Sequence, residues 1–440
     1  MPSDARPPAQ GAAGTARRRL VAYLSVSFLS SLGSAAALLG STIVSSDAGS
    51  SGGLAATYTA LMLALGFGAA SLATPYAGVL AHRFGTRRVS WVSTGFVVVA
   101  YAVLSILIWA GVPGFPALIA VTPVIGAAGG IGHVVGPPVV VAYCAGQELS
   151  RAEGWTSMAS GLAWVIGGVV GGVLIDAVGA PVAFLLNVVL SVPLVLMVAL
   201  VPPTVPIDEP AAQPRPWRSM LDSLRTNTRL IRACAFGIAT AILVGPFVSM
   251  VVPITREAGH DLAIHAGLIL AAASLGAVIS PLPLRRVGTR HGPLRAASIL
   301  GLACGVILVA LAAVISLYNG TPQLIGVLAF AVVFGAAQAS SGNLLIQDAA
   351  ASAADGAHQQ QDLAAYFLFA GLGTPIGSLL WANLARTSGV PWLLAYVGLA
   401  TVVVAVLMIL VLNRLGIHRA PALAPTPHGH PTPPHATHRL

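Results

Sequence analysis

The stretch SLATPYAGVLAHRFGTRR at residues 71–88 returns in altered form as SLGAVISPLPLRRVGTRH at residues 274–291. Each copy joins the end of an apolar run to an arginine-rich turn, at a constant offset of 203 residues (288 minus 85). A second match relates Gly167-Gly-Val-Val-Gly171-Gly-Val-Leu to Gly373-Thr-Pro-Ile-Gly377-Ser-Leu-Leu. Two independent matches at nearly one offset predict an internal duplication, and therefore a molecule built of two related halves.

The composition around this repeat is that of a chain whose solvent is lipid. Of 440 residues, 56% are hydrophobic and only 8% charged, with a mean hydropathy of +0.86, whereas roughly a quarter of the residues are charged in a soluble domain. A helix of about 20 apolar residues crosses the hydrocarbon core. Runs of that length are expected at 20–45, 54–81, 88–111, 116–145, 155–178, 181–202, 231–254, 262–284, 294–317, 323–347, 361–385 and 390–413.

We therefore expect an all-α integral membrane protein with twelve transmembrane helices in two pseudo-symmetric six-helix bundles. The expected divisions are a disordered tail at 1–19, a bundle at 20–202, a linker at 203–230, a second bundle at 231–415 and a disordered Pro/His-rich tail at 416–440. Because Arg17–Arg19 precede the first span and Ser34–Ala36 are small, a cleavable signal peptide is the alternative reading of that span. Its apolar run is too long for a signal, and its removal would break the match between the halves.

The positive charge reports topology. The net charge of +9 rests on arginine alone, since the chain has no lysine. With a cytoplasmic N-terminus, every arginine except Arg256 and Arg386 falls on the inner side, as the positive-inside rule requires. We expect a bacterial cytoplasmic membrane, both termini in the cytoplasm, and no nucleic-acid partner. Cys144, Cys234 and Cys304 lie too far apart to indicate a disulfide framework or a metal site, and are read as helix-packing residues.

Two polar segments interrupt this pattern. After the proline-rich linker, Trp217, Met220 and Leu224 share one helical face opposite charged residues, which predicts a short helix in the membrane interface; a partner-binding helix is the alternative. In the C-terminal tail, histidines alternate with proline, a pattern that allows loose metal binding but fits a disordered tail as well. We expect no cofactor, no specific metal site and no obligate protein partner.

The run Gly78-Val-Leu-Ala-His82-Arg83-Phe-Gly85-Thr-Arg87-Arg88 resembles the loop signature of the major facilitator superfamily, and lies between the second and third spans as in that family. The resemblance implies a secondary transporter whose halves rock about a shared cavity, with this loop and its repeat at Arg286, Gly288 and Arg290 taking part in gating. Gly85 permits a tight turn, and the arginines suit the anionic inner leaflet. His82 replaces an acidic residue that helps to latch the halves in the family, which implies a weaker or pH-sensitive latch.

The glycines of the fifth span resemble the antiporter signature of the same superfamily, with Gly168 in place of proline. Small residues allow a neighbouring helix to approach closely, either at a moving seam or in simple tight packing. The residues in question are Gly161, Gly167, Gly168, Gly171 and Gly172, with Gly373 and Gly377 in the second half. The following stretch, Asp176–Asn187, is similar to the branch that contains macrolide-efflux and siderophore-exporter proteins (drug:proton antiporters).

The family resemblance implies that spans one, four, seven and ten line the cavity. His133 in the fourth span is the candidate for proton coupling, because histidine titrates near neutral pH; a packing histidine is the alternative. It could face Gln338 of the tenth span. The predicted substrate cavity consists of Ser30, Ser31, Trp164, Phe247, Gln338, Ser341, Asn343 and Tyr366. The carboxylates Asp47, Asp176, Asp261 and Asp348 fall near span ends, where we interpret them as solvated loop positions, so no span shows a central acidic carrier.

We expect a transporter and not an enzyme. No P-loop is present, so ATP does not drive the cycle directly, and the acidic or paired-histidine patterns of membrane enzymes are missing. The favoured function is the export of a small amphipathic organic compound, a drug, antibiotic or siderophore-like metabolite, with protons as the coupling ion. An importer or uncoupled facilitator is the same-class alternative, and a lipid scramblase or membrane scaffold is the alternative of another class.

Overall fold

The computed structural model describes residues 10–50, 54–143, 149–203, 216–257, 259, 261–280, 292–352 and 356–414. Helices and the turns between them make up all of this described part, in which no strand occurs. The first half contains α1 (Gln10–Ser50), α2 (Ala55–Ala73), α3 (Tyr76–Phe84), α4 (Thr86–Trp109), α5 (Gly114–Tyr143), α6 (Leu149–Val178) and α7 (Pro181–Leu200). The second half contains α8 (Pro216–Thr226), α9 (Thr228–Leu243), α10 (Phe247–Glu257), α11 (Ala263–Ile279), α13 (Pro293–Leu317), α14 (Thr321–Ala350), α15 (Gly356–Ser388) and α16 (Val390–Arg414).

Among the described residues, eleven helical stretches are long and apolar enough to cross a membrane, with α9 and α10 together forming one of them. The twelfth is α11, a shorter apolar helix of 17 residues (Ala263–Ile279) that ends just before residues 281–291, which lie outside the described part. These stretches coincide with the twelve expected spans, so the predicted all-α membrane fold is confirmed.

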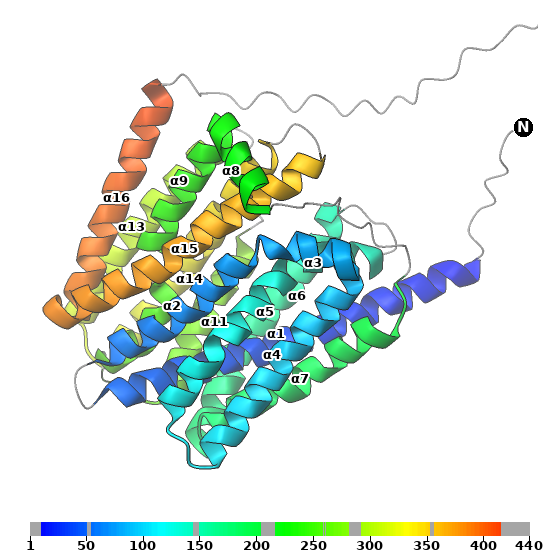
Figure 1. Ribbon diagram of the computed structural model, residues 1–440. Helices are drawn as coiled ribbons and strands as arrows, with labels where there is room; N and C mark the ends of the chain where they lie inside the picture. The colour runs from blue at the N-terminus through cyan, green and yellow to red at the C-terminus, as the bar shows by residue number, and fades with distance from the viewer. Residues whose placement is uncertain are drawn as a thin grey trace, which may run out of the picture.

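The two halves use the same helix neighbours. In the first half α4 packs on α5 and α7, α2 on α5, and α1 on α6; in the second half α13 packs on α14 and α16, α11 on α14, and α9 on α15. Figure 1 shows the first half at lower right, in blue to green, and the second at upper left, in green to orange-red. Between the halves, α6 lies against α11 and α2 against α15, so each half contributes equivalent helices to one seam.

The repeated glycines explain why this arrangement occurs twice. A Cβ added at Gly167 would lie 2.9 Å from Ala35 Cβ, and one added at Gly373 would lie 2.7 Å from Ala241 Cβ. Both contact pairs are separated by one offset, 206 residues (373 minus 167 and 241 minus 35). Gly171 and Gly377 likewise approach α1 and α9. In each half, therefore, the fifth span (α6 or α15) needs glycine to pack against the first span (α1 or α9).

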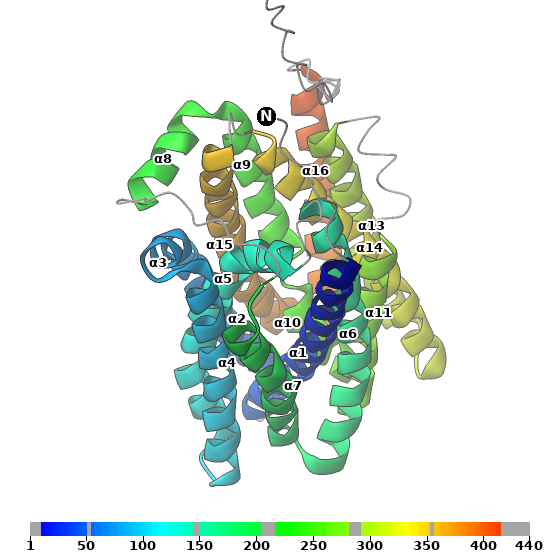
Figure 2. The ribbon, with the colours of Figure 1, turned by 90° about the vertical axis from the view of Figure 1, so that its right-hand side faces the viewer.

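The helix axes share two common ends (Figure 2). The end at the top of Figure 2 carries the start of α1, the helices α3 and α8, and the end of α16; we call it the basic end. The arginines at this end include Arg17, Arg18, Arg19, Arg83, Arg87, Arg88, Arg151, Arg218, Arg225, Arg229, Arg232, Arg295 and Arg414. The opposite, or far, end holds the connections α1–α2, α4–α5, α6–α7, α10–α11, α13–α14 and α15–α16, with Arg256 and Arg386.

Glycine and proline mark where helices stop. Gly85, at φ 85°, ends α3 and begins α4, as the sequence predicts. Pro75 follows the end of α2, and Gly245-Pro246 separates α9 from α10, so the second and seventh spans are each broken into two helices. The broken seventh span was not predicted, and it lies within an apolar run that periodicity cannot divide.

The predicted short helix after the linker is present as α8. Arg218, Asp222 and Arg225 are exposed, whereas Met220 is 2% exposed and packs in a core cluster with residues of α9, α14 and α15. The apolar face of α8 therefore lies largely on protein. Of the predicted tails, 1–9 and 416–440 lie outside the described residues, as does most of the linker (204–215), while α1 already begins at Gln10.

Candidate transport pathway between the two halves

The seam between α6 and α11 is built on glycine. A Cβ at Gly168 would lie 2.8 Å from the carbonyl oxygen of Gly267, and one at Gly172 would lie 2.7 Å from Ile264 Cα. Gly161 of α6 faces Val278 of α11. Gly168 and Gly172 thus hold the two halves in backbone contact, whereas Gly167 and Gly171 pack within the first half. The five predicted glycines serve two different interfaces.

Polar groups close the far end of this seam. Arg256 of α10 donates to the Asp47 carboxylate and, at 2.6 Å, to Ser46 Oγ, both on α1 of the other half. Asp176 at the end of α6 accepts from the backbone N–H groups of Ala263 (2.8 Å) and Ile264 (2.9 Å), the first residues of α11. A carboxylate is favourable at a helix N-terminus, where the amides lack partners within the helix.

Asp47 and Asp176 are exposed, as expected of solvated positions, but these contacts give them a role that the sequence did not predict. Asp47 and Asp176 each bind the opposite half of the molecule, and the residues they meet are far away in sequence. A cavity of about 290 Å³ lies beside them, lined by Asp47, Asp176, Asp261 and Arg256 together with apolar residues of α1, α6, α10 and α11. At the far end, charged groups of both halves therefore meet around one cavity.

His133 lies on an accessible face of α5. It is 19 residues from the start of the helix and 10 from its end (133 minus 114; 143 minus 133), and so lies nearer to the basic end. Its side chain is exposed, and a Cβ at Gly129 or Gly136, on the same helical face, would meet no atom within 4 Å. The imidazole contacts Phe367 of α15, with ring centroids 5.3 Å apart and planes at 84°. His133 therefore touches the other half; its predicted position opposite Gln338 stays a prediction.

The two predicted serines of the first span belong to hydrogen-bonded chains. Ser30 Oγ lies 2.9 Å from Ser191 Oγ, which donates to Asn187 Oδ1 at 2.7 Å. Ser31 Oγ accepts from Ser160 of α6 at 3.1 Å. Asn187 is 1% exposed and lies against Gly33, so the first chain fixes α1 on α7. Both predicted serines are half-buried.

The remaining predicted cavity residues differ in exposure. Phe247 is 1% exposed and packs on Phe334, with ring centroids 4.4 Å apart and planes tilted by 37°; Ser341 is 0% exposed and donates to Ala297 O at 3.2 Å. Tyr366 is buried against Gly237. Trp164 and Gln338 are half-buried, and Asn343 is exposed beside Gly342, where a Cβ would meet no atom within 4 Å. The enclosed side chains would line a cavity only in another conformation, so their role stays a prediction.

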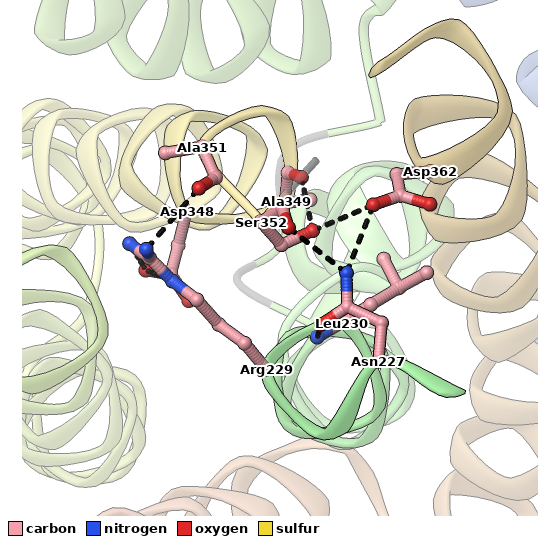
Figure 3. Close-up of polar contacts among 8 residues, drawn as sticks. All are labelled: Asn227, Arg229, Leu230, Asp348, Ala349, Ala351, Ser352 and Asp362. Atoms are coloured by element: carbon pink, nitrogen blue, oxygen red, sulfur yellow. Dashed lines mark hydrogen bonds and ion pairs between the residues drawn. The ribbon is translucent and has the colours of Figure 1, made fainter. Parts of the chain in front are cut away.

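A polar cluster fixes three helices of the second half at the basic end (Figure 3). Asp348 of α14, 4% exposed, accepts from Nε and Nη2 of Arg229 of α9 at 3.0 and 2.6 Å. Asn227 caps α9 by accepting from Leu230 N, and donates to Ser352 O and to Asp362 Oδ2 of α15, each at 3.1 Å. Asp348 is therefore a buried ion-pair partner, which corrects its interpretation as a solvated residue.

The predicted loop motif contributes a helix cap. Arg87 donates from Nε to Val198 O (2.7 Å) and from Nη2 to Ala199 O (2.8 Å), two carbonyls at the end of α7. A cation suits the C-terminus of a helix, where carbonyls lack partners within the helix. His82, Arg83 and Arg88 are exposed, and a Cβ at Gly78 would meet no atom within 4 Å. The repeat residues Arg286, Gly288 and Arg290 lie outside the described residues.

Metal and thiol chemistry find no support in the part of the chain that the structure describes. There, no three His, Cys, Asp or Glu residues are placed to hold a metal ion. Cys234 and Cys304 are buried free thiols, in different helices of the second half.

Comparisons with known proteins agree with this architecture. The family model described as Major Facilitator Superfamily matches residues 21–354. The human organic anion transporter MFSD10 (TETRAN) is similar in structure, with a TM-score of 0.64 and 16% identity over 92% of this chain and 100% of that one. The nucleoside transporter NupG (TM-score 0.61, 13% identity, 88% and 98% covered) and the E. coli fucose:proton symporter FucP (0.60, 12%, 88% and 97%) share the fold.

No curated protein sequence matches this chain. The family model nevertheless covers well over half of the sequence, and it includes both the loop motif and the glycine-rich fifth span. With its helices, duplicated halves and shared seam, the chain belongs to the Major Facilitator Superfamily and is a secondary transporter rather than an enzyme.

Proposed function

We propose that this protein exports a small amphipathic organic compound across the cell membrane by alternating access, coupled to protons. One observation carries the proposal: polar contacts close the seam at the far end, while the His133 face of α5 is accessible. The positive-inside rule supports a cytoplasmic basic end and cytoplasmic termini. A compound would then enter from the cytoplasm and leave when the far-end contacts break.

The chemistry of the candidate residues supports a neutral or weakly charged cargo. Ser30, Ser31, Gln338 and Asn343 offer hydroxyls and amides, and Phe367 offers an aromatic face next to His133. A sugar would need more hydrogen-bonding partners than these, because each unpaired hydroxyl in an apolar site costs about 1–3 kcal/mol. The resemblance of residues 176–187 to the branch with macrolide-efflux and siderophore-exporter proteins favours a drug, antibiotic or siderophore-like metabolite.

His133 is the proposed proton carrier. A neutral imidazole is tolerated within a membrane protein and gains a charge when a proton source reaches it. Because its ring contacts Phe367 of the opposite half, a charge there would change a contact across the seam. Protonation would then bias the equilibrium between the two orientations of the halves.

Proteoliposomes with an imposed pH gradient test this function. Chloramphenicol, a neutral antibiotic, and ethidium, a cation, serve as probes, and a pH dye in the lumen records the accompanying protons. We expect the gradient to drive the movement of chloramphenicol, and the probe to cause a proton flux in native protein. His133→Ala should abolish the proton flux while leaving downhill probe movement.

His265→Gln is the matched control, since His265 lies in α11 near the far end. It should retain coupling. Equal gradient-driven transport by native protein and His133→Ala would refute the assignment of His133. Gradient-independent equilibration of the probes would identify a facilitator, and lipid transfer between leaflets without probe movement would identify a scramblase.

A further inference from the structure

The elbow between α3 and α4 forms a cationic cavity at the basic end. Its volume is about 520 Å³, and its lining includes His82, Arg83, Thr86, Arg87, Arg88 and Trp91. Phe84, Gly85 and Ala199 complete the described lining, which contains no carboxylate. Three guanidinium groups around one cavity repel one another unless an anion is present, and planar guanidinium groups match phosphate oxygens.

The start of α4 adds hydrogen-bond donors to these charges. Gly85 precedes the helix and has no side chain that could cap its first amides, so the helix dipole faces the cavity without an acidic cap. Thr86 is 3% exposed, and among the described residues its hydroxyl has no hydrogen-bond partner. A buried hydroxyl in a cavity lining is costly unless a ligand or water pairs with it.

Arg87 anchors the cavity wall. Two of its nitrogen atoms bind carbonyl oxygens at the end of α7, which fixes the guanidinium in place while its charge is kept. Arg83 and Arg88 are exposed and can turn toward a ligand. The arrangement combines a fixed cation, two exposed cations and an unpaired buried hydroxyl at a helix N-terminus.

The cavity continues into a lipid-facing surface. On α4, Val92 (37% exposed) directly follows the cavity residue Trp91, and Phe96 (57%) and Val99 (59%) follow Val92 at spacings of four and three residues, which places these three on one helical face. On α7, Leu196 (50%) and Leu200 (73%) are exposed next to the lining residue Ala199. An anionic headgroup in the cavity would therefore have hydrocarbon-facing side chains directly beside it.

We propose that this cavity binds the phosphodiester headgroup of an anionic membrane phospholipid, with the acyl chains along the exposed faces of α4 and α7. A soluble phosphate would share the headgroup chemistry but would make no use of the apolar surface. The site lies apart from the transport seam, and its test is independent of cargo and of protons.

Native mass spectrometry of the detergent-solubilised full chain, titrated with lipid, tests the proposal. The probes are phosphatidylglycerol and phosphatidylcholine with identical acyl chains, and inorganic phosphate alone. We expect one site that prefers phosphatidylglycerol by about tenfold or more. The double variant Arg83→Gln/Arg88→Gln should weaken phosphatidylglycerol by roughly 30-fold, and Thr86→Val by roughly fivefold. Arg87 is left unchanged, because it also caps α7.

Arg17→Gln/Arg18→Gln is the matched control, since it removes two exposed arginines at the same end outside the cavity. It should retain the preference, and all variants should keep the native unfolding temperature. His82→Asp, which adds a negative charge to the lining, should reduce phosphatidylglycerol binding further than His82→Asn. Equal affinity for the two lipids, or equal loss in the control, would overturn the proposal. Inorganic phosphate that binds alone at millimolar concentration and displaces the lipid would overturn the lipid assignment in favour of a soluble anion.

Discussion

The seam between the halves is held differently at its two ends. At the far end, Arg256 and Asp176 each bind the opposite half through charge-assisted hydrogen bonds. At the basic end, no ion pair between two described residues joins the halves, and Tyr76 and Trp217 meet through their rings, with centroids 6.3 Å apart. The polar cluster of Figure 3 lies at the basic end but joins helices of one half only. Polar contacts thus stabilise closure at one end and the internal structure of a half at the other.

This difference has a consequence for the transport cycle. The halves contact each other along α6 and α11 through glycine, and a buried apolar cluster near the far end includes residues of both halves, among them Leu39 and Met250. Separation at the far end therefore requires the loss of the Arg256 and Asp176 contacts and of part of this apolar packing. The cost of breaking these contacts sets how readily the far end opens. The variants below, ordered by expected effect, separate the stability of one half from closure of the seam.

The largest effect is expected for Asp348→Ala. It leaves the Arg229 guanidinium partly buried without its carboxylate, which costs about 2–3 kcal/mol after allowance for the exposure of Arg229. Thermal unfolding in detergent should show a lower unfolding temperature, while far-end accessibility stays native. Asp222→Ala, in an exposed pair on α8, is the control and should change neither. A change in far-end accessibility with native stability would show that the cluster acts on the seam.

The next effect is expected for Gly172→Val. The added side chain meets the backbone of Ile264 across the seam, and overpacking of this kind costs about 1–3 kcal/mol. The far end should open, which can be measured by labelling of Met250→Cys, a position that is 0% exposed, with a membrane-impermeant maleimide in a chain without other cysteines. Gly78→Val, where a Cβ meets no atom within 4 Å, should leave the labelling rate native. Slow labelling in both variants would refute the role of Gly172 in closure.

Asp176→Ala should also open the far end and speed Met250→Cys labelling, but by less than Gly172→Val does. It removes two hydrogen bonds and a favourable charge from the start of α11, together worth about 1–2 kcal/mol, or roughly a five- to thirtyfold shift toward the open far end. Asp176→Asn keeps one acceptor and should fall between alanine and native. Identical Met250→Cys labelling in the native, asparagine and alanine proteins would contradict the assignment.

Arg256→Gln should have the smallest effect on far-end opening and on Met250→Cys labelling. Asp47 is 60% exposed at its side chain, so solvent screens the pair and its worth is about 1 kcal/mol or less. Added salt should reduce the difference in labelling rate between Arg256→Gln and native protein. If the pair acts across the seam, the charge exchange Arg256→Asp/Asp47→Arg should restore closure of the far end. Labelling of the exchanged protein as fast as that of Arg256→Gln would show that the pair does not hold the seam closed.

Local patterns in the sequence predicted the spans, the duplication, the turn at Gly85 and the helix at Pro216–Thr226, because hydropathy, periodicity and glycine act over short distances. The roles of Asp47, Asp176 and Asp348 were missed. Their partners are distant in sequence, as the 209 residues between Asp47 and Arg256 illustrate (256 minus 47). A carboxylate at the end of an apolar run has the same local signature whether water or another helix meets it.

The cavity predictions show a related limit. The family resemblance supplied the lining helices, but exposure depends on how the halves are tilted, so Phe247 and Ser341 are enclosed here while His133 and Asn343 are accessible. The break at Gly245-Pro246 left only a weak signal, a Gly-Pro pair inside an otherwise continuous apolar run. A conformation-dependent lining cannot follow from one local pattern.

Paired distance measurements test the central claim most directly, namely that the two halves rock as units about the seam. Spin labels at Val112 and Tyr318 report the far end, and labels at Trp155 and Ile231 report the basic end, all four being exposed. On a shift from the resting condition to a pH gradient with cargo, the account predicts a longer far-end distance and a shorter basic-end distance in the same fraction of molecules. Distances that stay fixed, or that lengthen together, while transport proceeds would contradict it.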